Sequence, residues 1–307
     1  MASAAWESMQ SLQGLIAEAT ARGVTLADLA LEYEAREAGV DVRELMARMG
    51  ERLQVMRGSV AEGVSPELRS YSGLTGPLGN KLLAHLAAAR AGEAHLLSGS
   101  STYLAAARAT AVMCVNGAMG RVVATPTAGS AGIVPAVLLT AAETLPAADE
   151  AVIRALFTAG IIGLVIANRA SISGAAGGCQ AEVGSAAGMA AGAAVELAGG
   201  SPEAVGAAVA LTLQNALGLP CDPVACLVEI PCIYRNAAFA AVALTMADLA
   251  LAGLRSPIPV DEVIDVMGQL GRRLPVELRE TGRGGLAATP TGIRLARQVL
   301  GREQVKS

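Results

Sequence analysis

The sequence has few of the side chains on which much enzyme chemistry depends. Only two histidines, His85 and His95, occur among 307 residues. This scarcity argues against a histidine-rich metal site and against a hydrolase triad. Aromatic residues make up only 2% of the chain, although 53% of it is hydrophobic, and alanine and glycine dominate. A chain of this composition packs its helices closely, with small residues at the contacts.

The chain also lacks the charge and the long apolar runs that point to particular partners. Its formal charge is −4 and its pI is about 5.4, so it has no basic surface for nucleic acid. No basic segment followed by an apolar one occurs at the start, which argues against secretion. The most apolar uncharged run, residues 155–167, is shorter than the ~20 residues of a membrane span. We therefore expect a cytoplasmic protein that binds neither nucleic acid nor a membrane.

Helix signals recur along the chain, and strand signals are rare. Capping residues, several of them followed by proline or an acidic residue, precede the expected helices: Thr25, Asp41, Ser65, Ser201 and Thr289. The pattern predicts helices over residues 4–21, 26–38, 42–57, 80–91, 100–119, 131–143, 147–167, 181–198, 236–253 and 260–272. The sequence therefore predicts an all-α protein.

A change in composition divides the chain near Gly63. Residues 1–60 are charged and amphipathic, whereas the remainder is rich in alanine and glycine and carries little charge. We expect residues 1–60 to form an N-terminal helical arm and residues 61–307 to form a separate domain.

A short motif occurs twice, as ATPTAGSAG at residues 124–132 and as ATPTG at residues 288–292. In both copies Thr-Pro-Thr lies at an expected helix start, with Thr125 as a cap and Pro126 as the first helical residue in the first copy. One interpretation is two ordinary N-caps. The other is that free backbone N–H groups bind a small anion such as a carboxylate. The candidate substrate-binding residues are then Thr125, Thr127, Gly129 and Ser130.

The five cysteines are the best candidates for chemistry. Cys179 follows two glycines, and Cys221 and Cys232 each follow a proline. Such segments present sulfur on loops instead of burying it, and loop thiolates can hold an iron–sulfur cluster or zinc. Their spacing matches neither a zinc finger nor a ferredoxin, so spacing alone leaves a metal site undecided. We expect Cys114 to be a small buried apolar residue, and Cys226 could be a ligand or a packing residue.

Four segments resemble the α chain of bacterial iron–sulfur-dependent L-serine dehydratase. They are ATPTAGSAG, ASISGAAGGCQAEVGSAAGMAA, CDPVACLVEIPC followed by IYRNA, and ETGRGGLAATPTG. The resemblance implies a lyase that converts L-serine to pyruvate and ammonia with a 4Fe–4S cluster. It assigns the cluster to Cys179, Cys221 and Cys232, which leaves one iron open as a Lewis acid. It also implies a separate β chain as partner, and it makes residues 61–307 an Ala/Gly-rich helical catalytic domain with cluster-bearing loops.

Two residues depart from the family pattern. Cys226 stands where the pattern has glycine, and it could compete for iron or form a disulfide in air. Arg169 stands where the pattern has asparagine, and it could alter the charge near the site.

The sequence leaves the general base open. Lys81, Ser130 and Ser171 are candidates, His85 and His95 are candidates by residue type, and a base from the β chain is the alternative. Two other functions also stay open: a non-catalytic iron–sulfur redox sensor, and a related lyase that acts on L-cysteine or L-threonine.

Overall fold

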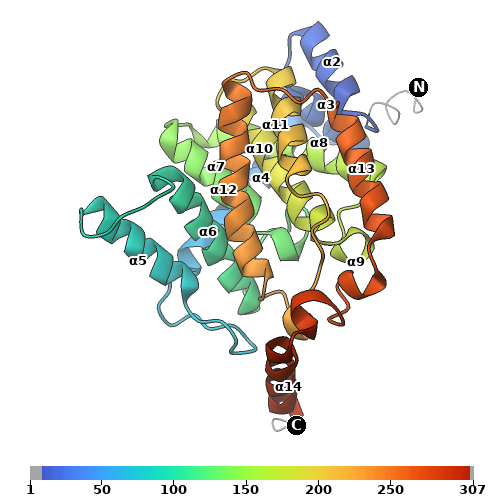
Figure 1. The fold of residues 1–307 in the computed structure, drawn as a ribbon. Helices are drawn as coiled ribbons and strands as arrows, with labels where there is room; N and C mark the ends of the chain where they lie inside the picture. The colour runs from blue at the N-terminus through green and yellow to red at the C-terminus, as the bar shows by residue number, and fades with distance from the viewer. Residues whose placement is uncertain (1–8, 305–307) are drawn as a thin grey trace.

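The computed structural model describes residues 9–304, which fold into α-helices joined by short helical turns and loops (Figure 1). No strand occurs in this part of the chain, so the all-α prediction is confirmed. The α-helices are α2 (Leu12–Arg22), α3 (Leu26–Ala38), α4 (Val42–Glu62), α5 (Leu78–Arg90), α6 (Ser100–Gly117), α7 (Ile133–Thr144), α8 (Asp149–Arg169), α9 (Gly174–Gly177), α10 (Ser185–Leu197), α11 (Pro202–Gln214), α12 (Cys232–Leu251), α13 (Val260–Arg273) and α14 (Pro290–Gln304).

Several helices begin at the predicted caps. The Thr25 hydroxyl accepts a hydrogen bond from the Asp28 N–H at 3.1 Å, and the Asp28 carboxylate accepts one from the Thr25 N–H at 2.9 Å. Ser201 caps α11 by accepting from the Ala204 N–H at 3.3 Å. Thr289 caps α14 in the same manner. Each of these bonds satisfies a backbone donor that the first helical turn leaves without a partner.

Other boundaries differ from the prediction. No helix begins at Ser65, because residues 63–77 form turns and loop, and α4 instead extends to Glu62. The first described helix begins at Leu12, where Ser11 accepts from the Gly14 N–H. The predicted start at residue 4 lies outside the described residues.

The helix predicted over residues 181–198 consists of two parts. A π-helical turn, η2 (Gln180–Gly184), precedes α10. The next long apolar helix, α12, begins at Cys232, four positions before the predicted start at residue 236. Both differences place a helical turn beside a cysteine, so they bear directly on the site.

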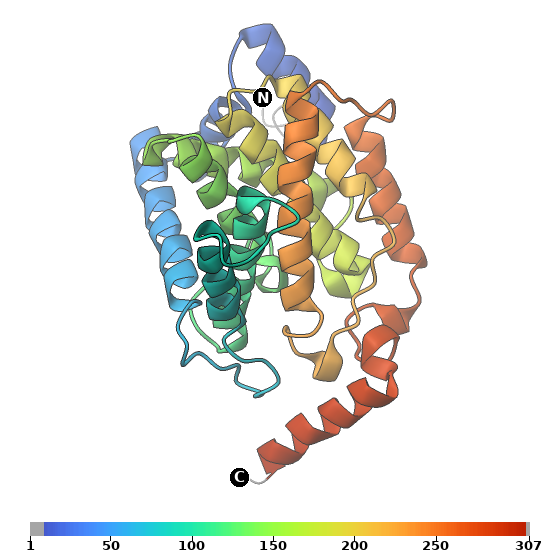
Figure 2. The ribbon, with the colours of Figure 1, turned by 60° about the vertical axis from the view of Figure 1, so that its left-hand side comes forward.

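Helix α10 lies at the centre of the molecule, surrounded by α7, α8, α11 and α12 (Figures 1 and 2). All its residues from Ser185 to Val195 are buried. A Cβ on Gly192 would lie 2.5 Å from Ile162 Cδ1 and 3.0 Å from Val209 Cγ2. Neighbouring helices therefore approach α10 this closely only because it carries alanine and glycine, as the composition predicts.

The N-terminal helices pack onto the outer side of this core. Helix α3 packs against α8, and α4 packs against both α6 and α8. Their buried leucines, including Leu26 and Leu53, belong to the same hydrophobic core as α8 and α10. The expected boundary near residue 60 falls inside α4. The division into an arm and a domain stays a prediction.

Helix α8 is long and apolar enough to cross a membrane by length and composition, and it is the one such helix in residues 9–304. However, 61% of its most apolar window is buried inside the protein. It packs against α3, α4 and α10. Most of this apolar window is therefore covered by packing in the core of this molecule.

Candidate metal and substrate site

Three segments that are distant in sequence bring Cys179, Cys221 and Cys232 into one region. Cys179 immediately precedes η2, Cys221 lies in the loop after α11, and Cys232 is the first residue of α12. The three residues are only 1%, 2% and 4% exposed. The expectation that these segments present sulfur on loops instead of burying it is therefore wrong. All three cysteines are buried in the packed helices, and Cys232 begins a helix itself.

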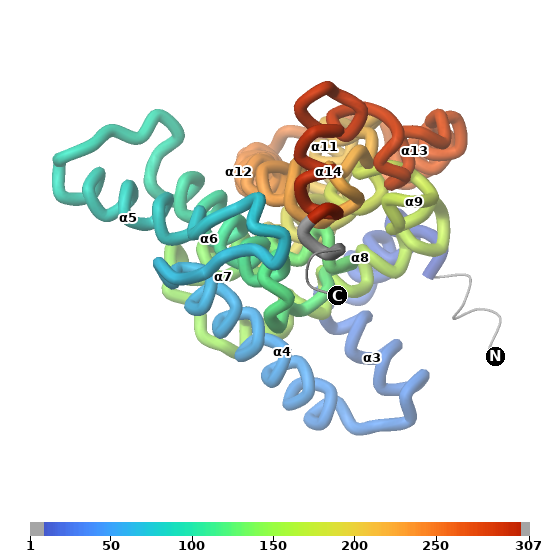
Figure 3. The backbone as a smooth tube through the Cα atoms, turned by 90° about the horizontal axis from the view of Figure 1, so that it is seen from below, coloured from blue at the N-terminus to red at the C-terminus, as the bar shows by residue number. Residues whose placement is uncertain are grey.

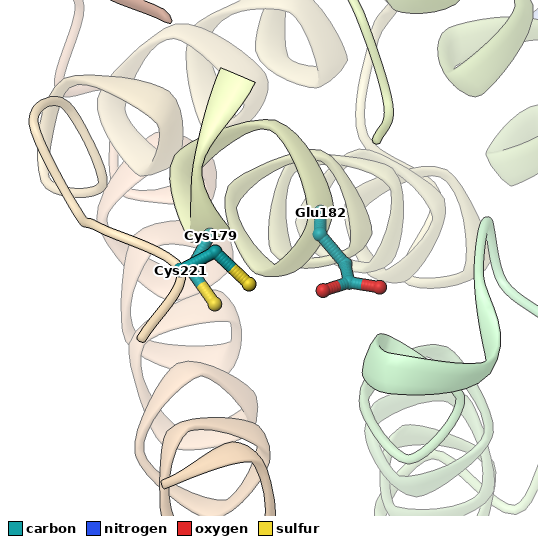
Figure 4. A group of neighbouring side chains, drawn as sticks. All are labelled: Cys179, Glu182 and Cys221. Carbon is teal, nitrogen blue, oxygen red and sulfur yellow. The ribbon is translucent and has the colours of Figure 1, made fainter. Parts of the chain in front are cut away.

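The sulfur atoms of Cys179 and Cys221 lie side by side, with the Glu182 carboxylate on the same side of the helical turn (Figure 4). The two Sγ atoms and a carboxylate oxygen of Glu182 lie within 4.8 Å of one another. Glycine clears the space around them. A Cβ on Gly174 would lie only 2.9 Å from Cys221 Sγ. Gly178, which precedes Cys179, adopts φ +76°, and its Cβ would lie 2.8 Å from the Leu219 carbonyl oxygen.

Cys232 is joined to this group through Asn236, one turn further along α12. The buried Asn236 amide donates to the Cys232 carbonyl at 2.9 Å and to the Gly129 carbonyl at 2.8 Å. Its Oδ1 accepts from the Gly132 N–H at 3.1 Å. Because every amide group is used, Asn236 fixes the start of α12 against residues 129–132.

Arg235 supplies positive charge beside the sulfurs. Its Nη1 donates to Cys179 Sγ at 3.4 Å and to the Pro220 carbonyl at 2.8 Å. Its Nη2 lies 2.8 Å from Asp222 Oδ1. The hydrogen bond from Cys221 and the charge of Arg235 lower the pKa of Cys179. A buried thiolate is the form of cysteine that binds metal, and Arg235 stabilises it here.

The other two thiols shift in the opposite direction. The pKa of Cys221 is raised, first by its hydrogen bond to Cys179 and then by burial. Burial raises the pKa of Cys232, and the neighbouring charge of Cys179 adds to the increase. A positively charged group such as a metal centre would favour deprotonation of both. The Cys179 and Cys221 sulfurs lie together with the Glu182 carboxylate, and Cys232 is near enough for the charge of Cys179 to act on it. Three cysteine thiolates are a donor set that iron–sulfur clusters use, so the residue types fit such a cluster.

Glu182 is the functional candidate that the sequence analysis missed. Its Oε1 accepts a hydrogen bond from the Thr127 hydroxyl, and the Gly129 N–H donates to the same carboxylate. Burial raises the pKa of Glu182, and the nearby Glu280 carboxylate adds to the increase. The signal was its position three residues after Cys179, which puts both side chains on one face of a helical turn.

The first Thr-Pro-Thr copy does not open a helix as predicted. The Thr125–Pro126 peptide bond is cis, and the short 3-10 turn η1 (Ala128–Ser130) follows Thr127. The prediction of Thr125 as a cap and Pro126 as a first helical residue is therefore wrong. Two of the expected substrate donors, the Thr127 hydroxyl and the Gly129 N–H, contact the protein's own Glu182. The assignment of Thr125, Thr127, Gly129 and Ser130 to substrate stays a prediction.

The second copy behaves as an ordinary cap, because the Thr289 hydroxyl accepts from the Gly292 N–H at 3.0 Å. The two copies therefore differ in structure despite their shared sequence. Only the first copy contacts Glu182.

The candidate bases are widely separated. Lys81 and His85 lie exposed on α5, and His95 lies exposed in the loop after it. Helix α5 and α9 occupy opposite edges of the molecule (Figures 1 and 3). Ser171 precedes α9, and its Oγ accepts from the Ser173 N–H at 3.1 Å. Ser130 is fully buried in η1, and its Oγ lies 3.1 Å from the Thr127 hydroxyl. Of these five, the structure brings Ser130 to the Glu182 carboxylate through Thr127.

The remaining cysteines lie apart from this group. Cys114 is buried, as predicted, and burial raises its pKa. Cys226 is exposed and adopts φ 57°, the left-handed region that favours glycine. This conformation explains why glycine suits the position. All five cysteines are free thiols.

Arg169 does not leave an uncompensated charge near the site. Its Nη2 donates to Asp265 at 2.7 Å, its Nη1 donates to the Gln10 carbonyl at 2.6 Å, and Asp261 lies 3.7 Å away. Two carboxylates of α13 therefore offset its charge. The residue links the end of α8 to α13.

Comparison with known proteins connects this arrangement to a family. The family described as serine dehydratase alpha chain matches residues 21–287. A probable L-serine dehydratase alpha chain of Bacillus subtilis is 49% identical over 95% of this chain and 95% of its own. An L-serine dehydratase alpha chain of Peptoniphilus asaccharolyticus is 38% identical over 91% of this chain and 94% of its own. The L-serine dehydratase TdcG of Escherichia coli is 45% identical over 58% of this chain and 40% of its own length.

Proposed function

The chain belongs to the serine dehydratase alpha chain family, and on this premise we propose that it is the α chain of an iron–sulfur-dependent L-serine dehydratase. In this reaction L-serine loses its α-proton and β-hydroxyl as water, and the enamine product is hydrolysed to pyruvate and ammonia. The observation that carries the proposal is the buried pair of Cys179 and Cys221 beside Glu182, with the buried Cys232 close enough for the charge of Cys179 to raise its pKa.

The three cysteines would hold a 4Fe–4S cluster and leave one iron without a protein ligand. When bound, such a cluster supplies a Lewis-acidic iron that makes the serine hydroxyl a better leaving group. The protein keeps the three sulfurs in place through separate elements, so that movement of the loop after α11 or of α12 changes their spacing.

Arg235 and Asp222 position the sulfur donors. Arg235 donates to Cys179 Sγ from the first turn of α12, so it joins the element that carries Cys232 to the segment that carries Cys179. Asp222 lies 2.8 Å from the guanidinium and accepts from the Leu286 N–H at 2.8 Å through Oδ2. This chain of contacts couples the loop of Cys221 to the ETGRGG segment, whose Glu280 N–H donates to the Cys221 carbonyl at 2.7 Å.

We further propose that the enzyme is cytoplasmic and that a separate β chain completes it. The B. subtilis and P. asaccharolyticus relatives are named alpha chains, which supports a β-chain partner. The E. coli relative has more than half of its length outside the matched segment, which is consistent with one longer chain that contains both parts. A base from the β chain accords with the positions of Lys81, His85 and His95, away from the cysteines.

The test is anaerobic purification of the chain with and without the β chain. Iron and sulfide content and pyruvate formation from L-serine, L-threonine and L-cysteine are then measured. We expect a bound cluster and the highest kcat/KM for L-serine when both chains are present. A cluster-loaded complex that turns over none of the three amino acids would support a non-catalytic role, and a preference for threonine or cysteine would support a related lyase.

A further inference from the structure

The carboxylate of Glu182 is held in one orientation inside the site. Thr127 donates to Oε1, and the Gly129 N–H donates to the same carboxylate. A Cβ on Gly129 would lie 2.5 Å from Oε1 and 2.9 Å from Oε2. The backbone therefore approaches the carboxylate this closely only because residue 129 is glycine. The η1 turn thus orients an anion that the protein itself provides.

The second oxygen of Glu182 faces the space above Gly174. The point that a Gly174 Cβ would occupy lies 3.2 Å from Glu182 Oε2, 3.4 Å from Glu280 Oε2 and 2.9 Å from Cys221 Sγ. Two carboxylate oxygens and a sulfur of the proposed cluster site therefore converge on Gly174, where even a methyl group would lie too close to the sulfur. Glu182 is 7% exposed, whereas Glu280 is exposed, so the pair extends from the interior towards solvent.

The position of Glu280 is fixed by its backbone. Its N–H donates to the Cys221 carbonyl at 2.7 Å, and it adopts φ 62° although it is not glycine. The neighbouring cation, Arg235, is directed elsewhere, to Cys179, Pro220 and Asp222. The space above Gly174 is therefore flanked by negative charge.

We propose that Glu182, with Glu280, binds the α-ammonium group of the substrate, an assignment that rests on the proposed serine dehydratase function. An amino acid is a zwitterion at neutral pH, and its ammonium group has three N–H donors that charged acceptors bind strongly. Two carboxylates that face one space repel each other, and a cation between them removes that penalty. The pair therefore selects 2-amino acids over hydroxy acids of the same length that lack the amino group.

This assignment also orients the substrate. The donors of Thr127 and Gly129 are used by Glu182, so the substrate carboxylate lies elsewhere, away from η1. The ammonium group at Gly174 then places the α-carbon beside Cys221. Glu182 acts here as a binding and specificity residue, and the group that removes the α-proton is a separate question.

The test uses the cluster-loaded enzyme together with the β chain, purified without oxygen. The probes for binding are L-alanine and propanoate, which differ by the ammonium group and lack the hydroxyl that leaves as water. Calorimetric titration gives their dissociation constants, and L-serine kinetics gives kcat and KM. In Glu182→Gln we expect L-alanine to bind about tenfold or more weakly, while propanoate changes by less than about twofold. KM for L-serine should rise by a similar factor.

Further variants separate binding from cluster retention. Glu280→Gln should show the same selective loss to a smaller degree, because Glu280 is exposed. Thr127→Val removes the hydroxyl that orients Glu182 but leaves the charge of Glu182 in place, so it should weaken the binding of L-alanine moderately. Glu277→Gln, an exposed position three residues before Glu280, should bind both probes as the wild type does. Iron content is measured in each variant.

Two results would overturn the assignment. One is an unchanged preference for L-alanine over propanoate in iron-loaded Glu182→Gln, or an equal loss of affinity for both probes. The other is loss of iron from Glu182→Gln combined with an unchanged preference in Thr127→Val, which would make Glu182 a support of the cluster. If wild-type enzyme binds L-alanine through Glu182 yet forms no pyruvate, the proposed reaction fails and the ammonium site stands.

Discussion

At the scale of single residues, the site depends on side chains that are small or missing as much as on those that react. Gly174, Gly178 and Gly129 each face a sulfur, a carbonyl or a carboxylate at a distance that a Cβ would not allow. Cys179 gains a hydrogen bond from Arg235, whereas Cys226, five residues after Cys221, lies exposed in a left-handed conformation. Burial therefore separates the three proposed ligands from Cys226, and the contact with Arg235 distinguishes Cys179 from the buried Cys114.

The first prediction concerns these ligands. Cys179→Ser, Cys221→Ser and Cys232→Ser should each lose most of the iron, because a serine hydroxyl is a poor ligand for a soft cluster site. Cys114→Ser serves as the buried control and should keep its iron. Iron content and visible absorbance after anaerobic reconstitution measure the effect. Full iron occupancy in any of the three variants would remove that residue from the ligand set.

A second prediction concerns Gly174. In Gly174→Ala the new methyl group would lie 2.9 Å from Cys221 Sγ, so we expect lower iron retention and lower activity in a protein that still folds. Gly58→Ala is the matched control, because nothing lies within 4 Å of its Cβ position on α4. That control should gain about 0.5–1 kcal/mol of stability from helix propensity. Equal iron content in both variants would contradict the steric argument.

At the scale of elements, some helix boundaries are set by local sequence signals and others by tertiary contacts. The caps at Thr25, Ser201 and Thr289 are local, so the sequence predicts them correctly. The start of α12 at Cys232 and the short η1 turn depend on Asn236, whose partners lie more than a hundred residues away. A hydrogen bond between residues so far apart in the chain leaves no pattern in the local sequence. The bond that orients Glu182 is also non-local, since its partner Thr127, just before η1, lies 55 residues away in the sequence.

Helix α3 offers a test of a tertiary cap. The Glu196 carboxylate accepts from the Leu26 N–H at 2.9 Å, the Ala27 N–H at 3.2 Å and the Thr158 hydroxyl at 2.6 Å. Glu196→Ala leaves these donors unsatisfied, and it should lower the free energy of unfolding by about 1–3 kcal/mol.

Denaturant unfolding measures that loss, with Glu51→Ala on the exposed face of α4 as the control. The control should change stability by less than about 0.5 kcal/mol. An equally small change in Glu196→Ala would show that water replaces the carboxylate at the start of α3.

At the scale of the whole molecule, the candidate site lies where segments from the middle and the end of the chain meet. Its parts come from η1, from the segment between α8 and η2, from the loop after α11, from α12 and from the segment that contains Glu280. The resemblance of the chain to a family predicts the three cysteines as ligands, because they lie in long ordered motifs. The spacing of the cysteines alone could not do so, since it reflects the lengths of intervening helices.

The last prediction follows from the proposed open iron. Air should inactivate the purified enzyme, because an iron without a protein ligand is accessible to oxidants as well as to substrate. Ferrous iron with a thiol should restore activity, and added pyridoxal phosphate should have no effect. Pyruvate formation before and after exposure to air measures the change. Full activity after aerobic purification would favour a closed cluster or a different cofactor.

The alanine and glycine content of α10 has a further consequence for the site. Alanine and glycine have no side-chain rotamers to lose on folding, so the central helix becomes ordered with little side-chain entropy loss. It also has few side chains that can switch between conformations once folded. The η2 turn with Glu182 continues directly into this helix, and Cys179 immediately precedes the turn. The proposed ligand and the proposed ammonium acceptor are therefore anchored to a part of the core with few mobile side chains, which favours one fixed distance between them.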